Sequence, residues 1–81
     1  MRIKVIVNYG QNTGLVILEV INGFKIKESL KEKGFRFEKG SEAYGCPSKW
    51  VKKVDKVTAV QLKEFFETLG LTIEKGIRVY D

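Results

Sequence analysis

The sequence predicts a two-layer α+β domain in which two helices cover one face of an antiparallel-rich sheet. Two observations lead to this prediction. Short alternating or apolar segments, typical of strands, occur in pairs, and two segments with helical features separate these pairs. The predicted order of elements is ββαββαββ. The 81 residues provide for a single domain, residues 1–81, with one compact core.

The first two strands are predicted from their apolar residues. Residues 2–7 alternate, so that Ile3, Val5 and Val7 share one face. Residues 15–21 are nearly all apolar and rich in β-branched side chains, which indicates a central strand. The turn-rich segment between them predicts a hairpin. A phosphate-binding loop is not favoured, because no Lys-Ser or Lys-Thr pair and no helix follow its glycines.

The next three elements are a helix and two strands. The helix is predicted over residues 23–33, with Asn22 as its N-cap and Gly34 as the residue that ends it. Residues 35–38 predict a short strand, on which Phe35 and Phe37 share one face as core residues do. Residues 49–54 predict another strand, whose faces are described with the functional candidates below.

A second helix and a final hairpin complete the predicted fold. Thr58-Ala-Val-Gln61 matches a capping box, which predicts the start of the helix, and Gly70 ends it. The spacing i, i+3, i+4 and i+7 gives this helix a strong apolar stripe, formed by Leu62, Phe65, Phe66 and Leu69. Residues 71–74 and 77–80 then predict two strands around the turn Lys75-Gly76.

One part of the sequence occurs nearly twice, at an offset of 36 residues. Residues 27–40 and 63–76 share six identities over 14 aligned positions. Each copy contains a helix end, a glycine, a short strand and a Glu-Lys-Gly turn. The echo indicates either an internal duplication or a coincidence of common helix-ending signals. Residues 41–53 are not repeated, and this segment is where we expect the function to lie.

Positive charge is concentrated in the middle of the chain. The sequence has 15 basic and 10 acidic residues, a formal net charge of +5. The window from Lys25 to Lys56 holds ten basic and five acidic residues, and the rest of the chain holds five of each. A local excess of this kind favours polyanionic partners. The alternative is a solubilising surface rich in Lys and Glu.

The composition argues against an enzyme and against a metal centre. Histidine is absent, which removes the usual general base near neutral pH and the commonest metal ligand. Cys46 is the single cysteine, so it has no disulfide partner and no second thiolate for zinc. We therefore expect no catalysis, no cofactor and no metal. No apolar stretch approaches a membrane span and no secretory signal is recognised, so a cytoplasmic protein without membrane contact is expected.

Residues 36–53 combine basic and aromatic side chains, which predicts a binding site for nucleic acid, either DNA or RNA. Basic residues neutralise phosphates, and aromatic rings stack on unpaired bases. The predicted contact residues are Arg36, Lys39, Tyr44, Lys49, Trp50 and Lys53.

Alternation along residues 49–54 divides these candidates between two faces. Lys49 and Lys53 share one face, and Trp50 and Val54 share the other. Trp50 has two interpretations, as a stacking residue or as a core residue, because a lone tryptophan in a small domain is commonly buried. Tyr44 lies in a Gly/Pro-containing loop and is the better candidate for exposure.

A protein-interaction module is the alternative function. The predicted strand at residues 77–80 is short and amphipathic. An unprotected edge strand is a template for pairing with another chain. Self-association as a homodimer through this strand is therefore the second hypothesis.

Two resemblances to known families rest on the helix that ends in Leu30-Lys-Glu-Lys-Gly34, on Phe35-Arg-Phe37 and on Trp50-Val51. This pattern resembles small α+β accessory modules of helicases, including HARP-type domains, in which a helix, a glycine, an aromatic-basic strand and a tryptophan-containing strand recur. Such modules bind DNA, so the resemblance implies contacts at Arg36, Lys49 and Trp50. It covers about 20 to 25 residues.

The second resemblance is to the HicA-type mRNA interferases, which have a dsRBD-like fold. In that family the helix, glycine and aromatic strand are followed by Lys-Gly-Ser and then by the catalytic histidine. Here Lys39-Gly40-Ser41 is followed by Glu42. The resemblance therefore implies a related fold and no nuclease activity.

Overall fold

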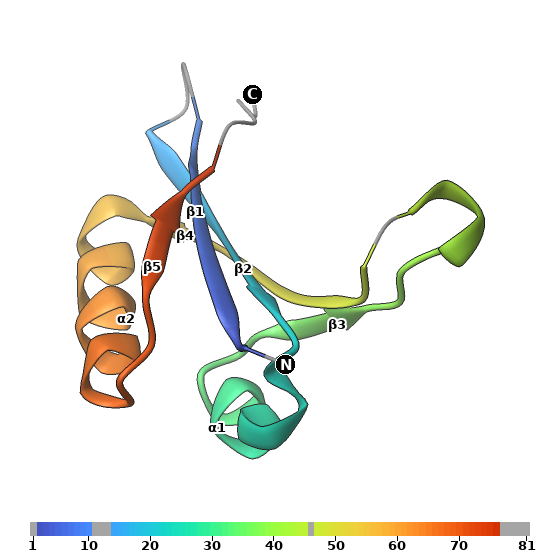
Figure 1. Ribbon diagram of the computed structural model, residues 1–81. Helices are drawn as coiled ribbons and strands as arrows, with labels where there is room; N and C mark the ends of the chain where they lie inside the picture. Colours follow the sequence, from blue (N-terminus) through green and yellow to red (C-terminus); the bar gives the residue numbers. More distant parts are fainter. Residues whose placement is uncertain (1, 11–13, 46, 77–81) are drawn as a thin grey trace.

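The computed structural model describes residues 2–10, 14–45 and 47–76, which form a mixed five-stranded sheet with two helices (Figure 1). The strand order in the sheet is β3-β4-β2-β1-β5. The strands are β1 (Lys4–Tyr9), β2 (Leu15–Ile21), β3 (Arg36–Glu38), β4 (Lys49–Asp55) and β5 (Ile73–Lys75). The helices are α1 (Lys27–Glu32) and α2 (Lys56–Thr68), and short 3-10 turns occur at η1 (Gly23–Ile26) and η2 (Glu42–Tyr44).

The central strands pair as the sequence predicts. β1 and β2 form an antiparallel hairpin, and β2 pairs antiparallel with β4 along its whole length. β2 covers the predicted residues 15–21. β1 begins and ends two residues later than predicted, because Asn8 and Tyr9 continue the pairing with Ile17 and Val16.

Both helices pack on the same face of the sheet and share one core with it. Facing residues of paired strands point to the same side, so the register groups Val5 with Val20 and Val16 with Val54 on the helix-covered face. The ring of Phe35 meets that of Phe66 edge-on, with centroids 5.8 Å apart. The buried apolar residues of the core are Val5, Val7, Val16, Leu18, Val20, Leu30, Phe35, Trp50, Val54, Ala59, Leu62 and Phe66.

The N-terminal ends of both helices differ from the predicted caps. α2 begins at Lys56 and its N-cap is Asp55, whose Oδ1 accepts a hydrogen bond of 2.8 Å from the Thr58 N–H. This aspartate precedes the predicted capping box and satisfies the first-turn amide directly. The hydroxyl and the N–H of Thr58 both hydrogen-bond the Asp55 carboxylate and lower the pKa of that group.

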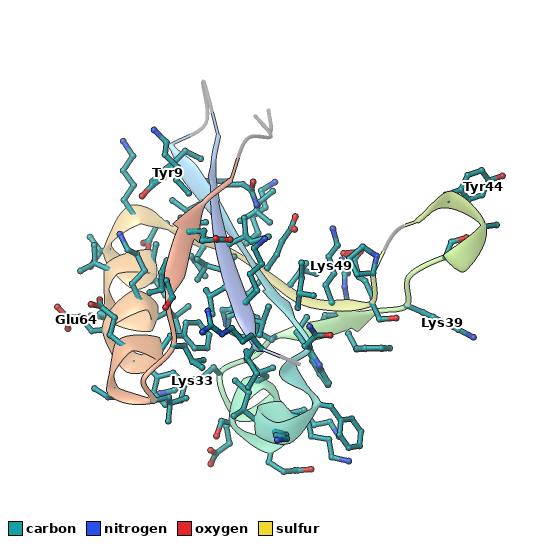
Figure 2. All side chains as sticks on the ribbon, in the orientation of Figure 1. Tyr9, Lys33, Lys39, Tyr44, Lys49 and Glu64 are labelled. Carbon is teal, nitrogen blue, oxygen red and sulfur yellow. The ribbon has the colours of Figure 1, made fainter. Side chains whose placement is uncertain are left out.

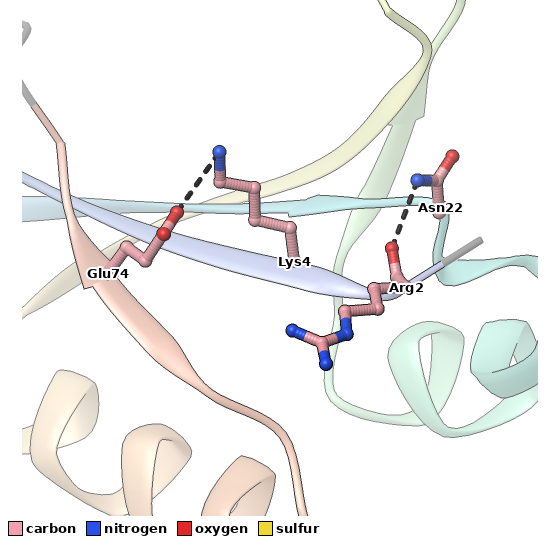
Figure 3. Close-up of polar contacts among 4 residues, drawn as sticks. All are labelled: Arg2, Lys4, Asn22 and Glu74. Atoms are coloured by element: carbon pink, nitrogen blue, oxygen red, sulfur yellow. Dashed lines mark hydrogen bonds and ion pairs between the residues drawn. The ribbon is translucent and has the colours of Figure 1, made fainter.

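Asn22 does not cap a helix. It has a left-handed backbone with φ of 61°, and its side chain makes no cap hydrogen bond. Its Nδ2 donates instead to the Arg2 carbonyl at 3.0 Å (Figure 3). The predicted helix over residues 23–33 is divided into the turn η1 and the short helix α1.

The two helices end in the same way, which gives the sequence echo a local structural meaning. Gly34 has φ of 87°, its N–H donates to the Lys31 carbonyl at 3.0 Å, and the Phe35 N–H donates to the Leu30 carbonyl at 2.9 Å. This is the Schellman pattern. The same pair of bonds ends α2. The Gly70 N–H donates to the Glu67 carbonyl at 2.9 Å, and the Leu71 N–H donates to the Phe66 carbonyl at 3.1 Å.

The strands that follow the two glycines lie at opposite edges of the sheet. β3 pairs antiparallel with β4, whereas β5 pairs parallel with β1. β5 therefore joins the sheet next to the first strand. The predicted partner of β5 at residues 77–80 lies outside the described residues, and the order through residue 76 is ββαββαβ.

An arm formed by the connection between β3 and β4 projects away from the sheet and helices (Figure 1). It carries η2 and includes most of the segment that the sequence echo leaves unrepeated. None of its described residues belongs to the buried core.

Candidate nucleic-acid interface

The face of the sheet opposite the helices carries most of the predicted contact residues. Pairing places Arg36 opposite Val51, Lys49 opposite Glu38, and Lys53 opposite Ile17. Arg36, Lys49 and Lys53 therefore share this surface, which we call the open face. Arg36 and Lys53 are solvent-exposed, whereas Lys49 is only partly so.

Two adjoining hollows lie on the open face, and both include Glu19, Glu38 and Lys49 in their lining. The first has a volume of about 510 Å³, and the basic residues that line it are Lys4, Lys39, Lys49 and Lys75. The second has a volume of about 820 Å³, and the basic residues that line it are Arg36, Lys49, Lys52 and Lys53. Among the described residues, both hollows are thus bordered by more basic than acidic side chains.

An ion pair lies where the two hollows meet. Lys49 Nζ is 3.3 Å from Glu19 Oε1, and the Glu19 side chain is only 7% exposed. A carboxylate that is this far buried on a central strand needs charged or hydrogen-bonding partners to offset its lost hydration. Lys49 therefore has a structural task in addition to any ligand contact.

A second ion pair, at the β1–β5 edge, is exposed. Lys4 Nζ is 3.1 Å from Glu74 Oε2, and both side chains are about half exposed (Figure 3). Exposed pairs of this kind contribute about 0–1 kcal/mol to stability. This pair therefore moderates the local charge at the rim of the first hollow without fixing the fold.

Asn8 brings an unusual polar group to the first hollow. Its side chain is buried, and its Nδ2 has no hydrogen-bond partner in the part of the chain that the structure describes. Gly76 lies directly against it: a Cβ atom built on Gly76 would overlap the Asn8 Oδ1. The glycine of the second Glu-Lys-Gly turn is therefore required by this close contact with Asn8.

The two predicted aromatic contacts do not lie on the open face. Trp50 pairs with Val20 on the helix-covered face and is 9% exposed, so its core interpretation is confirmed. Tyr44 is 85% exposed on the arm. Figure 2 shows Tyr44 near the tip of the arm and Lys39 and Lys49 close to its base. The open face thus gathers basic residues with Ile6, Ile17, Ile21 and Val51 and without the predicted stacking rings.

Lys52 has a different environment from its neighbour Lys53. It pairs with Leu18 on the helix-covered face, and its Nζ donates a hydrogen bond of 2.6 Å to the Lys33 carbonyl at the end of α1. A cation at the C-terminal end of a helix satisfies a carbonyl without an intrahelical partner and complements the helix dipole. Lys52 therefore contributes to joining α1 to the sheet.

Sequence reasoning missed an exposed aromatic cluster. Phe37 was expected in the core with Phe35, but Phe37 is 50% exposed, because β3 is an edge strand of the sheet. Phe24, in η1, is 71% exposed. The sequence shows these aromatic residues, but whether they are exposed depends on the strand order of the sheet, which the local sequence does not specify.

Among the described residues, no three His, Cys, Asp or Glu side chains gather in an arrangement suited to a metal ion. Cys46 lies outside the described part of the chain. Neither helix combines the length and the apolar character that a membrane-spanning helix requires, as far as the described residues go.

No protein-family model, curated protein or solved structure matches the chain. The resemblances to helicase accessory modules and to HicA-type proteins remain predictions from short motifs.

Proposed function

We propose that this protein is a non-catalytic nucleic-acid-binding module that contacts phosphates with the open face of its sheet. The observation that carries the proposal is the gathering of Arg36, Lys39, Lys49 and Lys53 around two adjoining hollows. Cations arranged in this way neutralise phosphates and release counterions. The half-buried apolar residues between them offer no ring for stacking, so this surface suits the sugar-phosphate backbone and not particular bases.

Asn8 also lines the first hollow, together with Lys39 and Lys49. Its Nδ2 is buried and has no hydrogen-bond partner among the described residues, so we assign it no phosphate contact. The charge of Glu19 and Glu38 opposes a polyanion here, and we therefore assign the phosphate contacts mainly to the exposed Arg36, Lys39 and Lys53.

Salt dependence tests the proposal. Three phosphate contacts predict that the logarithm of the affinity falls with log salt with a slope of about −2 to −3. Fluorescence polarisation with labelled single-stranded and duplex oligonucleotides, at about 50 mM and about 200 mM salt, measures this slope. The absence of salt-dependent binding at micromolar protein would contradict the function.

A matched pair of double variants tests the site. Arg36→Gln with Lys53→Gln removes two charges from the open face and leaves the Glu19–Lys49 pair intact. We expect the affinity to fall by at least about tenfold and the slope to shrink by about 2. Lys56→Gln with Lys63→Gln removes the same charge from α2 and should change the affinity little. Equal losses in the two variants would show that only net charge matters and that the open face is not the site.

Association with a protein remains the alternative function. The edge strand that the sequence suggests for a homodimer, residues 77–80, lies outside the described residues. Sedimentation velocity over a range of micromolar concentrations distinguishes the two functions. A mass that rises with protein concentration, together with no binding of oligonucleotides, would favour self-association.

A further inference from the structure

An aromatic hollow lies on the other side of the β3–β4 hairpin from the open face. It has a volume of about 500 Å³, and three aromatic rings line it, from Phe24, Phe37 and Trp50. Phe24 is largely exposed and Phe37 is half exposed, although phenylalanine favours burial. A cluster of exposed rings around a hollow is a feature of ligand-binding surfaces.

The rings are held in position before any ligand arrives. The Phe37 and Trp50 ring centroids are 5.2 Å apart with an interplanar angle of 58°. Trp50 is anchored in the core, so Phe37 packs on a fixed partner while half of it faces solvent. Rings that are already ordered lose little conformational entropy when a flat ligand stacks on them.

The charges around the hollow are of one sign. Lys27 and Lys31 line it from successive turns of α1, and none of the described residues that line it is acidic. Lys27 Nζ lies 4.3 Å from the centroid of the Phe24 ring, which is a cation–π contact. The hollow therefore suits a ligand that is both flat and anionic.

We propose that this hollow binds an unpaired base of a single-stranded nucleic acid, with Lys27 and Lys31 on the neighbouring phosphates. The inference rests on the proposed function and names its substrate class. Aromatic faces stack on any base, whereas the bases of an intact duplex are not available for stacking. Pro47 lines both this hollow and the first hollow of the open face, so one strand can contact both surfaces at the base of the arm.

Trp50 supplies an intrinsic readout, because it is the only tryptophan in the chain and lines the hollow. We expect an oligothymidine of about a dozen nucleotides to quench its fluorescence on binding, and a hairpin-closed duplex of equal charge to quench it much less. Phe24→Leu and Phe37→Leu keep apolar bulk and remove one ring each. Each is expected to weaken single-strand binding about tenfold and to leave duplex binding unchanged.

Matched controls exist for both parts of the site. Tyr9→Leu removes an exposed ring that lies near Lys75 at the other end of the sheet, where Lys75 Nζ is 5.9 Å from the ring centroid. Lys27→Gln with Lys31→Gln is compared with the Lys56→Gln, Lys63→Gln pair used above. Thermal melts verify that each variant is folded. If Phe37→Leu disturbs the contact with Trp50, the role of the aromatic rings is judged from Phe24→Leu alone.

The outcomes separate this inference from the proposed function. The inference would be overturned, and the proposed function left standing, by the following combination of results. The protein would bind single strands and duplexes with equal affinity, and this binding would be lost in Arg36→Gln with Lys53→Gln but retained in Phe24→Leu. No salt-dependent binding of any oligonucleotide would overturn both. Quenching of Trp50 by an acidic peptide with an aromatic residue, with no oligonucleotide bound, would replace the nucleic acid with a protein partner. A tenfold loss for single strands alone in Phe24→Leu supports the inference.

Discussion

Lys49 shows how one side chain can serve both the fold and the ligand. The sequence placed it with Lys53 on one strand face, and the register confirms this. The structure adds that Lys49 pairs with a nearly buried carboxylate, whereas Lys53 is exposed. A loss of binding after substitution of Lys49 would therefore mix two causes, destabilisation and loss of a phosphate contact.

Lys49→Met and Lys53→Met separate these causes. Lys49→Met removes the Lys49 cation from beside the nearly buried Glu19, so we expect the free energy of unfolding to fall by about 1–3 kcal/mol. Lys53→Met removes the same charge from an exposed position and should change it by less than about 0.5 kcal/mol. Urea denaturation measures both, since urea does not screen charges. Equal free energies of unfolding for the two variants would show that the Glu19–Lys49 ion pair does not contribute to stability.

Trp50 and Phe37 mark the limit of residue-level prediction. Alternation along β4 correctly predicted that Trp50 and Lys49 point to opposite faces. It could not tell how completely each face is covered, because this depends on where the helices pack. Phe37 pairs with Trp50 on the same face, yet it is half exposed because β3 is at the edge of the sheet.

Among the elements, helix ends were predicted better than helix starts. The stops at Gly34 and Gly70 are confirmed, since a left-handed residue after a helix requires little beyond local sequence. The predicted helix starts were less accurate. Asp55, which precedes the predicted capping box, is the N-cap of α2, and Asn22 caps no helix because its side chain donates to the carbonyl of Arg2, which is distant in the sequence. The strand at residues 15–21 was predicted with its observed bounds, because no other residues compete to define the ends of this continuous apolar segment.

The N-cap of α2 predicts a pH dependence of stability. Hydrogen bonds from Thr58 lower the pKa of Asp55 in the folded state, so folding favours the charged carboxylate. Its stabilising effect is fully present above the unfolded-state pKa of about 3.9 and is lost as the pH falls through the lower folded-state pKa. Asp55→Asn keeps a capping oxygen and cannot ionise.

Urea midpoints of the wild type and of Asp55→Asn, measured between about pH 2 and pH 7, test this linkage. The advantage of the wild type should be constant above about pH 5 and should disappear at the acid end. A difference between the two proteins that does not vary over the whole range would show that the charge of Asp55 does not contribute.

The sequence echo is also best judged at the level of elements. The two helix ends have the same hydrogen bonds at an offset of 36 residues, but the strands that follow join different partners with different orientation. Local signals thus recur where the tertiary pairing does not, and pairing between distant strands is what a sequence pattern specifies least. Internal duplication remains a prediction.

At the scale of the whole molecule, the fold and the proposed binding surfaces are largely separate. The buried core joins both helices to β1, β2 and β4, and the arm contributes none of its described residues to it. The basic residues of the window from Lys25 to Lys56 lie both on the open face and on α1, on either side of the β3–β4 hairpin. The sequence predicted contacts only within residues 36–53, so it did not predict the proposed surface on α1.

Replacing residues 40–47 by a short Gly- and Asn-containing turn tests this separation. The core is left untouched, and a shorter loop changes the closure entropy by less than about 1 kcal/mol, so we expect a nearly unchanged thermal midpoint. Binding of single strands should weaken, because Pro47 joins the two surfaces and the end of the arm carries Tyr44. A control that replaces residues 11–13, between β1 and β2 in the sequence, with other polar residues should bind normally. An arm-shortened protein that retains wild-type affinity would exclude the arm from the interface and confine binding to the sheet and α1.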